Sequence, residues 1–216
     1  MSIEALTEAD DGPRSKRPAI LAAAVECFGE VGFEGTKWSQ VAERVGIGQP
    51  ALYHYFESKT HCLLTIMRLG LRNSDDAFRA AVADSGSAHD AVCAAVRAAF
   101  DISPQEVQQN RILQSNIALL SGRRTSEREE AERQACRKLV ARIERNWADL
   151  VQQGIERGEL ARHDPVLMAR SLLGLVVSVW RWYRPDGSME LPAIADFICG
   201  CCVRMVDAHT PEQPSG

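Results

Sequence analysis

The stretch GIGQPALYHYFESK, residues 46–59, decides the fold of this chain. It places two glycines and a proline ahead of three aromatic side chains, a histidine and a lysine, between two segments with the periodicity of amphipathic helices. The glycines predict a tight turn after residue 45 and a new helix that begins at Gln49. This short helix has an apolar face, with Leu52 and Phe56, and a polar face that is available to a partner.

The composition describes a chain that can bury a large core. It has 216 residues, of which 45% are hydrophobic. The first residues are acidic and lack the apolar centre of a signal peptide, and the longest apolar run, residues 172–180, is far shorter than the ~20 residues of a membrane span. Seven cysteines at irregular spacing do not resemble a secreted disulfide framework. We therefore expect a soluble, cytoplasmic protein without a membrane partner, whose cysteines are mostly buried thiols.

The patterns typical of active sites are missing from this sequence. It contains no nucleophile elbow, no zinc-protease motif and no phosphate-binding loop. Residues 46–51 formally spell a dinucleotide-binding fingerprint, but a helix precedes them where that motif needs a strand. Cys199 and Cys202 form a C-x-x-C pair with no second pair to complete a metal site. We expect no catalytic residue, no metal and no cofactor.

Helical periodicity runs along the whole chain, and no alternating segment is long enough to predict a strand. We expect an all-α protein of about nine helices. Its expected organisation is a flexible tail at 1–16, a small helical domain at 17–60, a larger helical domain at 61–210 and a disordered tail at 211–216. The predicted helices span residues 17–31, 36–45, 49–56, 58–83, 91–100, 105–120, 126–157, 165–183 and 192–208.

Residues 33–59, FEGTKWSQVAERVGIGQPALYHYFESK, resemble the DNA-binding segment of the TetR family of transcriptional regulators. The resemblance is carried by GFEGT at 32–36, by the apolar positions of VAERVGI at 41–47, by LYHYF at 52–56 and by Ser58-Lys59. It covers about the first third of the chain. It implies an N-terminal three-helix head, residues 17–60, that contains a helix-turn-helix, followed by a larger helical domain for ligand binding and dimerisation. Gly48 departs from the small polar residue usual in the family, which removes a side-chain cap.

Some candidate DNA contacts follow from the geometry of a helix-turn-helix, whose second helix enters the major groove with its first turn. The family resemblance implies that Tyr53, His54 and Tyr55 also approach phosphates or bases. A glutamine in that turn can bond an adenine edge, and small apolar side chains can touch thymine methyl groups. Side chains at the starts of the second and fourth helices suit phosphates. Trp38 and Tyr55 have two interpretations, DNA contact or packing. The predicted contacts are Thr36, Lys37, Trp38, Gln49, Pro50, Ala51, Tyr53, His54, Tyr55 and Lys59.

The last two predicted helices are apolar on nearly every face. A helix of this kind has to be covered on all sides. We therefore expect them to pair with a second copy of the chain as a four-helix bundle. A symmetric dimer would present two recognition helices to half-sites about 34–36 Å apart on a palindromic operator.

An effector site is expected between the fourth and eighth helices. The candidate effector-binding residues are Asn116, Asn146, Trp147, Trp180 and Arg181. The two asparagines interrupt apolar stripes, where they serve either a ligand or a contact between helices. WRWYRP at 180–185 looks like a segment of family members that respond to acyl-CoA thioesters, so an amphipathic, anionic effector is expected.

The leading hypothesis is a homodimeric, sequence-specific repressor that a small molecule releases from DNA. A net charge of −4 argues against general coating of nucleic acid but permits a local contact surface. Two alternatives stay open at this stage. An all-α enzyme is disfavoured by the missing catalytic residues. A helical protein-interaction module without DNA binding is permitted by Gly48 and by the acidic total.

Overall fold

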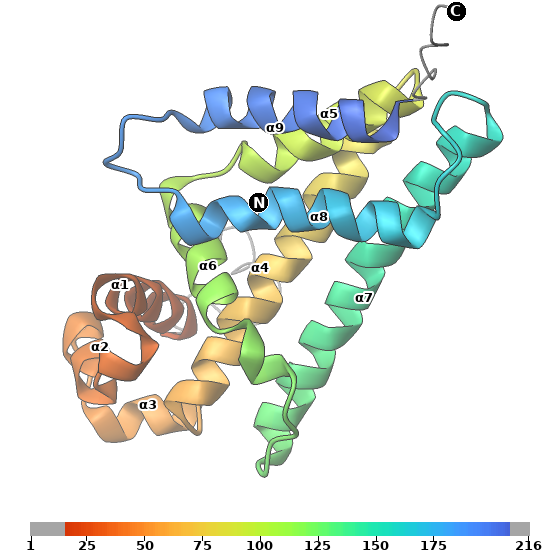
Figure 1. Cartoon of the computed structure of the whole chain (residues 1–216). Helices are drawn as coiled ribbons and strands as arrows, with labels where there is room; N and C mark the ends of the chain where they lie inside the picture. Colours follow the sequence, from red (N-terminus) through yellow and green to blue (C-terminus); the bar gives the residue numbers. More distant parts are fainter. Residues whose placement is uncertain (1–15, 208–216) are drawn as a thin grey trace, which may run out of the picture. The chain divides into compact units, whose positions relative to one another are not determined.

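The computed structural model describes residues 16–207, and within this range the chain consists of helices and their connections, without a strand (Figure 1). The all-α prediction is confirmed. The predicted tails, apart from Lys16, lie outside the described residues. The elements are α1 (Arg17–Gly35), α2 (Trp38–Val45), α3 (Gln49–Tyr55), α4 (Lys59–Val82), α5 (Ala88–Phe100), α6 (Pro104–Ser115), the 3-10 helix η2 (Ile117–Leu120), α7 (Glu127–Glu156), α8 (Pro165–Trp182) and α9 (Leu191–Val206).

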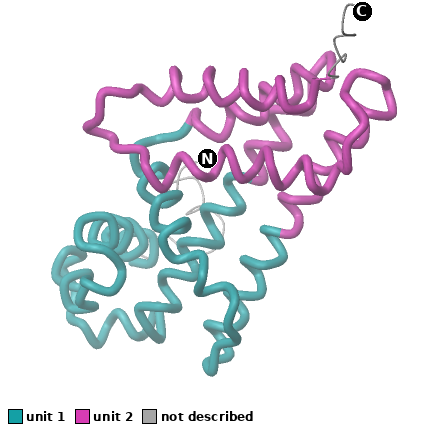
Figure 2. The backbone as a smooth tube through the Cα atoms, viewed as in Figure 1, with its two compact units in different colours: residues 1–74, 102–140 teal, residues 75–101, 141–216 magenta. Residues whose placement is uncertain are grey.

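The chain forms two compact units, which Figure 2 shows in different colours. The first unit comprises residues 1–74 and 102–140, and the second comprises residues 75–101 and 141–216. Helices α4 and α7 each contribute residues to both units. The predicted division near residue 60 is a division by function, and it stays a prediction. The compact units are divided differently, because α6 and the start of α7 belong to the same unit as the head.

The first unit is built around α1. Its buried face includes Ile20, Ala24 and Phe28, and α2 and α6 both pack on this helix. The backbone leaves helical geometry at Gly32, where φ is 78°, which is where the helix was expected to end. It resumes for three more residues. The predicted helix at 105–120 is divided, because α6 ends at residue 115 and η2 follows.

The second unit is organised by α5 and α9, which lie along each other, with α8 packed on α9. Asp164 caps α8 as expected, because its carboxylate accepts hydrogen bonds of 2.9 Å from the amides of Val166 and Leu167. Within the described part of the chain, no helix is long and apolar enough to cross a bilayer.

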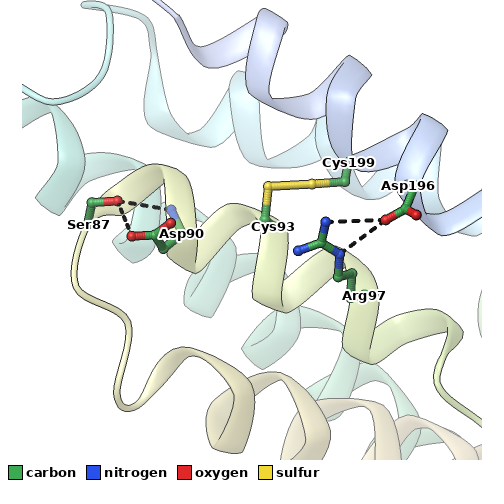
Figure 3. Close-up of a disulfide and its surroundings, with 6 residues drawn as sticks. All are labelled: Ser87, Asp90, Cys93, Arg97, Asp196 and Cys199. Atoms are coloured by element: carbon green, nitrogen blue, oxygen red, sulfur yellow. Dashed lines mark hydrogen bonds and ion pairs between the residues drawn. A yellow bond between two sulfur atoms is a disulfide. The ribbon is translucent and has the colours of Figure 1, made fainter.

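One pair of cysteines is an exception to the expectation of mostly buried thiols. Cys93 on α5 and Cys199 on α9 form a disulfide, with their Cα atoms 5.3 Å apart (Figure 3). The other five cysteines are free, and four of them are buried. The two bonded positions are separated by 106 residues, so only the packing of α5 on α9 brings them together.

Candidate DNA-binding site and effector cavity

The turn between α2 and α3 has the geometry of a helix-turn-helix. Gly46 adopts a left-handed conformation with φ of 70° and ends α2 by donating its amide to the carbonyl oxygen of Glu43. A Cβ atom added at Gly46 would meet no atom within 4 Å, so lack of space does not require glycine here. The left-handed backbone angle is what favours glycine. Gly48, in contrast, has an ordinary φ of −68° at the N-cap of α3. Its backbone does not require glycine.

Helix α3 has the two predicted faces. Leu52 and the adjoining Phe56 are fully buried, and they fix the helix to the head. Gln49, Pro50 and His54 are exposed. Tyr53 is 49% exposed, whereas Ala51 and Tyr55 are half-buried. The polar face of α3 is therefore accessible from its first turn onward, and the position of Tyr55 leaves its two interpretations open.

Two predicted phosphate contacts have roles inside the protein. Thr36 is only 2% exposed, and its hydroxyl is within hydrogen-bond distance of the carbonyl oxygens of Cys27 (3.0 Å) and Gly32 (2.7 Å). Lys59 donates through Nζ to the carbonyl oxygens of Phe33 (2.6 Å) and Thr36 (2.8 Å), and this ammonium lies 4.4 Å from the centre of the Phe33 ring. Thr36 and Lys59 thus hold the junction of α1 and α2.

The start of α2 also differs from the prediction. Lys37 occupies the N-cap position expected for Thr36, and its amide donates to the side chain of Gln40 at 2.7 Å. The side chain of Lys37 is exposed. Trp38 is buried, and its indole Nε1 has no acceptor among the described residues. In this structure Trp38 belongs to the packing of the head, while Lys37 is free to approach a phosphate.

Polar contacts join the connection between α3 and α4 to the beginning of α7, all within the first unit. Ser58 donates to Glu129 at 2.5 Å, and Ser126 donates to Glu57. One helical turn further along α7, Glu132 pairs with Arg68 of α4 at 2.5 Å. The residues that pair are separated by 64 to 71 positions, so no local pattern in the sequence indicated them.

His61 is a buried imidazole at the base of the head. Its Nδ1 accepts a hydrogen bond of 3.3 Å from the amide of Glu57, and its ring meets Phe56 edge-on. Burial lowers the pKa of His61 below its ordinary value, and this effect exceeds the opposite effect of the nearby carboxylates of Glu132 and Glu57. The acceptor role of Nδ1 also requires the neutral ring. The sequence showed this histidine only as a helical residue.

The second unit contains an open cavity of about 400 Å³. It lies among the end of α4, the start of α5 and the second half of α7, and no residue of α8 lines it. This cavity does not coincide with the expected position between the fourth and eighth helices, which stays a prediction. Its lining residues are Phe78, Arg79, Val82, Ala83, Ser85, Ser87, Ala88, Ala91, Asn146, Asp149, Leu150, Gln153, Gly154 and Arg157.

Only Asn146 among the predicted effector residues lines this cavity. Asn116 is the C-cap of α6 in the first unit, and its amide donates to the carbonyl of Ile112 at 2.8 Å. Trp147 is buried against Phe78, and Trp180 is buried against Phe100. Arg181 is exposed and absent from the lining. Capping accounts for Asn116 and packing for Trp147 and Trp180, and an effector contact at these four positions stays a prediction.

A buried carboxylate stands beside the cavity. Asp75 on α4 has no exposed surface, and Asn146 donates its amide to it at 2.8 Å. Arg142 and Arg79 pair with the same carboxylate at 2.8 and 3.4 Å. Because Asp75 holds the amide nitrogen of Asn146, the amide oxygen is left as an acceptor. This cluster was not predicted, because Asn146 and Arg142 lie on α7, far from Asp75 along the sequence.

Comparisons with known proteins agree with this geometry. Residues 20–66 match the profile of "Bacterial regulatory proteins, tetR family", and residues 85–206 match that of "Tetracyclin repressor-like, C-terminal domain". The transcriptional activator FasR of Mycolicibacterium smegmatis is 30% identical over 105 residues, so the chain spans about half (48%) of that relative. The repressor KstR2 of Rhodococcus jostii is 28% identical over 87% of this chain and 90% of its own length.

A solved structure is similar over nearly the whole fold. The crystal structure of AibR in complex with isovaleryl coenzyme A and operator DNA has a TM-score of 0.70 and 25% sequence identity, and the match covers 87% of this chain and 97% of that one. The matched profiles cover both the head and more than half of the chain. The resemblance inferred from residues 33–59 is confirmed, and the chain belongs to the TetR family of bacterial regulatory proteins.

Proposed function

We propose that this chain is a homodimeric transcriptional repressor that binds a palindromic operator and leaves it when a small molecule occupies the cavity of the second unit. The observation that carries the proposal is the exposed polar face of α3, held by a fully buried Leu52 on its opposite side. A protein-interaction module would not need this arrangement. As a regulator bound to bacterial DNA, the protein works in the cytoplasm and catalyses no reaction.

The proposed reading surface consists of the first turn of α3 and the residues beside it. Gln49 is exposed at the first position of the helix, where its amide can pair with an adenine edge. Pro50 and Ala51 follow with apolar surface suited to thymine methyl groups. Tyr53 and His54 extend the surface toward the backbone. Lys37, exposed before α2, supplies the charge for a phosphate that positions the head without reading sequence.

The proposed dimer uses α8 and α9. Leu167 on α8 is 63% exposed and Phe197 on α9 is 67% exposed, and Val166 and Trp182 are also open to solvent. Apolar side chains of this size, gathered on two helices, mark an interaction surface. A second copy covers them by two-fold symmetry, in which each subunit offers the same surface.

The proposed effector is amphipathic and anionic, of the acyl-CoA class. The cavity offers apolar surface from Phe78, Val82 and Leu150, and positive charge from Arg79 and Arg157. AibR, the structural neighbour described above, binds isovaleryl coenzyme A together with operator DNA. Helix α4 begins directly after the head and ends in the cavity wall. A coupling of about 1–3 kcal/mol through it would change DNA affinity 5–150-fold.

Selection of bound fragments from genomic DNA tests the proposal. We expect an enriched palindrome and a DNA affinity that falls steeply as the salt concentration rises. Addition of an acyl-CoA such as isovaleryl-CoA should release the protein from this DNA. Gln49→Ala should relax the preference at one base pair of each half-site by about 1–3 kcal/mol. The exposed Glu34→Ala serves as the matched control. Recovery of no enriched sequence at low salt would overturn the DNA-binding proposal.

A further inference from the structure

Helices α5 and α9 are joined by three links along one line. His89 lies 2.6 Å from Asp207, Cys93 is bonded to Cys199, and Arg97 pairs with Asp196 at 3.2 Å. On α5 these positions recur every fourth residue, which places them on one face of the helix. Their partners run in the opposite direction along α9 and include Asp207, the residue that follows this helix. Figure 3 shows the disulfide with the pair of Arg97 and Asp196 beside it.

Apolar side chains also pack between the two helices. Val92 and Val96 of α5 are fully enclosed, as is Cys202 of α9, and Ile198 is nearly so. The polar pairs on either side of the disulfide do not involve sulfur. The interface therefore has apolar packing and polar pairs in addition to the covalent bond.

We infer that Cys93–Cys199 is a reversible, redox-controlled bond that sets the mobility of the cavity wall. In the reducing bacterial cytoplasm, disulfides are usually transient and serve catalysis or sensing. The inference rests on the proposed function in this respect, since binding to operator DNA places the chain in that compartment. Cys93 is half-buried and Cys199 is buried, so the sulfur of Cys93 is the one that a reagent can reach.

Reduction by a dithiol protein of the thioredoxin class proceeds by exchange. A thiolate of the reductant attacks Sγ of Cys93, the sulfur–sulfur bond breaks, and Cys199 leaves as a thiolate that takes up a proton. The second thiolate of the reductant then displaces Cys93 from the mixed disulfide. The protein gains two electrons and two protons, and the reductant leaves as its own disulfide.

Oxidation by hydrogen peroxide reverses the change. The thiolate of Cys93 attacks one oxygen of the peroxide, which yields a sulfenic acid and, after protonation, water. Cys199 then attacks the sulfenic sulfur and displaces a second water. Two thiols and one peroxide thus give one disulfide and two waters. A neighbouring thiol that resolves the sulfenic acid is the arrangement expected of a reversible sensor.

The bond acts on the effector cavity through α5. Ala88 and Ala91 of this helix line the cavity, and Cys93 follows Ala91 by two residues. The oxidised form ties this wall covalently to α9. Reduction leaves only the noncovalent links, so residues 83–91 gain freedom to move when a ligand enters. The redox state of the cell would thereby adjust the response to the effector.

The full-length protein in glutathione buffers of graded composition provides the test. After alkylation, peptide mass spectrometry should show Cys93 and Cys199 titrating together as a two-electron pair while the far-ultraviolet circular dichroism stays native. Hydrogen exchange of amides in residues 83–91 should become about fivefold faster on reduction. Cys93→Ser should show the faster exchange under all conditions, whereas Cys201→Ser, a part-exposed cysteine outside the bond, should behave as the wild type.

Two results would overturn the inference. One is a disulfide that is reduced only when the protein unfolds, which would assign it a structural role. The other is exchange in residues 83–91 that is the same in both redox states. Neither measurement uses DNA or an effector. Failure to find an operator therefore refutes the proposed function alone, and the two failures are distinguishable.

Discussion

The ammonium group of Lys59, the first residue of α4, donates a hydrogen bond to the carbonyl oxygen of Thr36 at 2.8 Å. This contact joins the beginning of α4 to the segment that precedes α2. The same ammonium reaches the carbonyl of Phe33. A lysine that its position at a helix start assigned to phosphate is thus used to hold the head together.

Lys59→Met should therefore act on stability first. It keeps the apolar stem but removes two charge-assisted hydrogen bonds, and we expect a loss of about 1–3 kcal/mol, measured by urea unfolding. The matched control is Lys37→Ala, at an exposed position. It should leave the unfolding midpoint unchanged, weaken DNA binding similarly on all sequences and reduce the salt slope by about 1. An unchanged midpoint in Lys59→Met would contradict the assignment of the clamp.

The two glycines of the turn should respond in opposite directions to the same substitution. Gly48→Ser fits its backbone, and the nearest atom to an added Cβ is 3.7 Å away on Pro50. Serine at this N-cap should stabilise the head by a few tenths of a kcal/mol and tighten DNA binding through an added hydroxyl. Gly46→Ser forces a side chain into left-handed geometry and should cost about 1–2 kcal/mol. Thermal unfolding of the two variants compares them directly, and equal shifts would argue against the turn geometry described here.

Stability should fall in mild acid because of His61. Its folded-state pKa lies below the ordinary value of 6.5, since burial disfavours the charged ring. Between these two pKa values the unfolded chain binds a proton that the folded chain does not. The contribution of the neutral ring is thus fully present above pH 6.5 and declines as the pH falls through that window.

Urea midpoints measured from pH 5 to 8 would show this dependence. His61→Gln should flatten the curve between pH 5 and 6.5, while His163→Gln, at an exposed position, should leave it as in the wild type. A curve for His61→Gln that follows the wild type would assign the acid sensitivity to other groups.

The carboxylate of Asp75 should matter far more than that of its neighbour Asp76. Both pair with Arg79, but Asp75 is buried and also holds Arg142 and Asn146. Asp75→Ala removes the carboxylate that Arg142 and Asn146 share, and it should lower the free energy of unfolding by about 1–3 kcal/mol. Asp76→Ala removes an exposed ion pair and should change stability by less than about 1 kcal/mol. The difference in urea midpoint between the two variants is the measurement, and equal losses would show that the cluster beside the cavity contributes little.

Local signals in the sequence were sufficient to predict the fold and the two faces of α3. Helical periodicity, the turn at Gly46 and the cap at Asp164 depend on residues within a few positions of one another, and the structure has all three. The outward positions of Gln49 and Tyr53 follow from helical spacing once Leu52 is assigned to the core.

Such local signals do not predict contacts between segments that are far apart in the sequence. The disulfide joins positions 106 residues apart, and the hydrogen bond from Asn146 to Asp75 spans 71 residues. The position of the cavity depends on how the start of α5 packs, which periodicity does not determine. The hydrogen bond from Thr36 to Cys27 was missed for the same reason, because its acceptor lies in the preceding helix.

The division of α4 and α7 between the two compact units has a consequence for protein engineering. A chimeric regulator would combine the operator preference of one family member with the inducer range of another. Its simplest design has a single crossover. Here one crossover after the head would separate α6 and the start of α7 from the residues with which they form a compact unit. Three junctions, after residues 74, 101 and 140, would keep each unit intact.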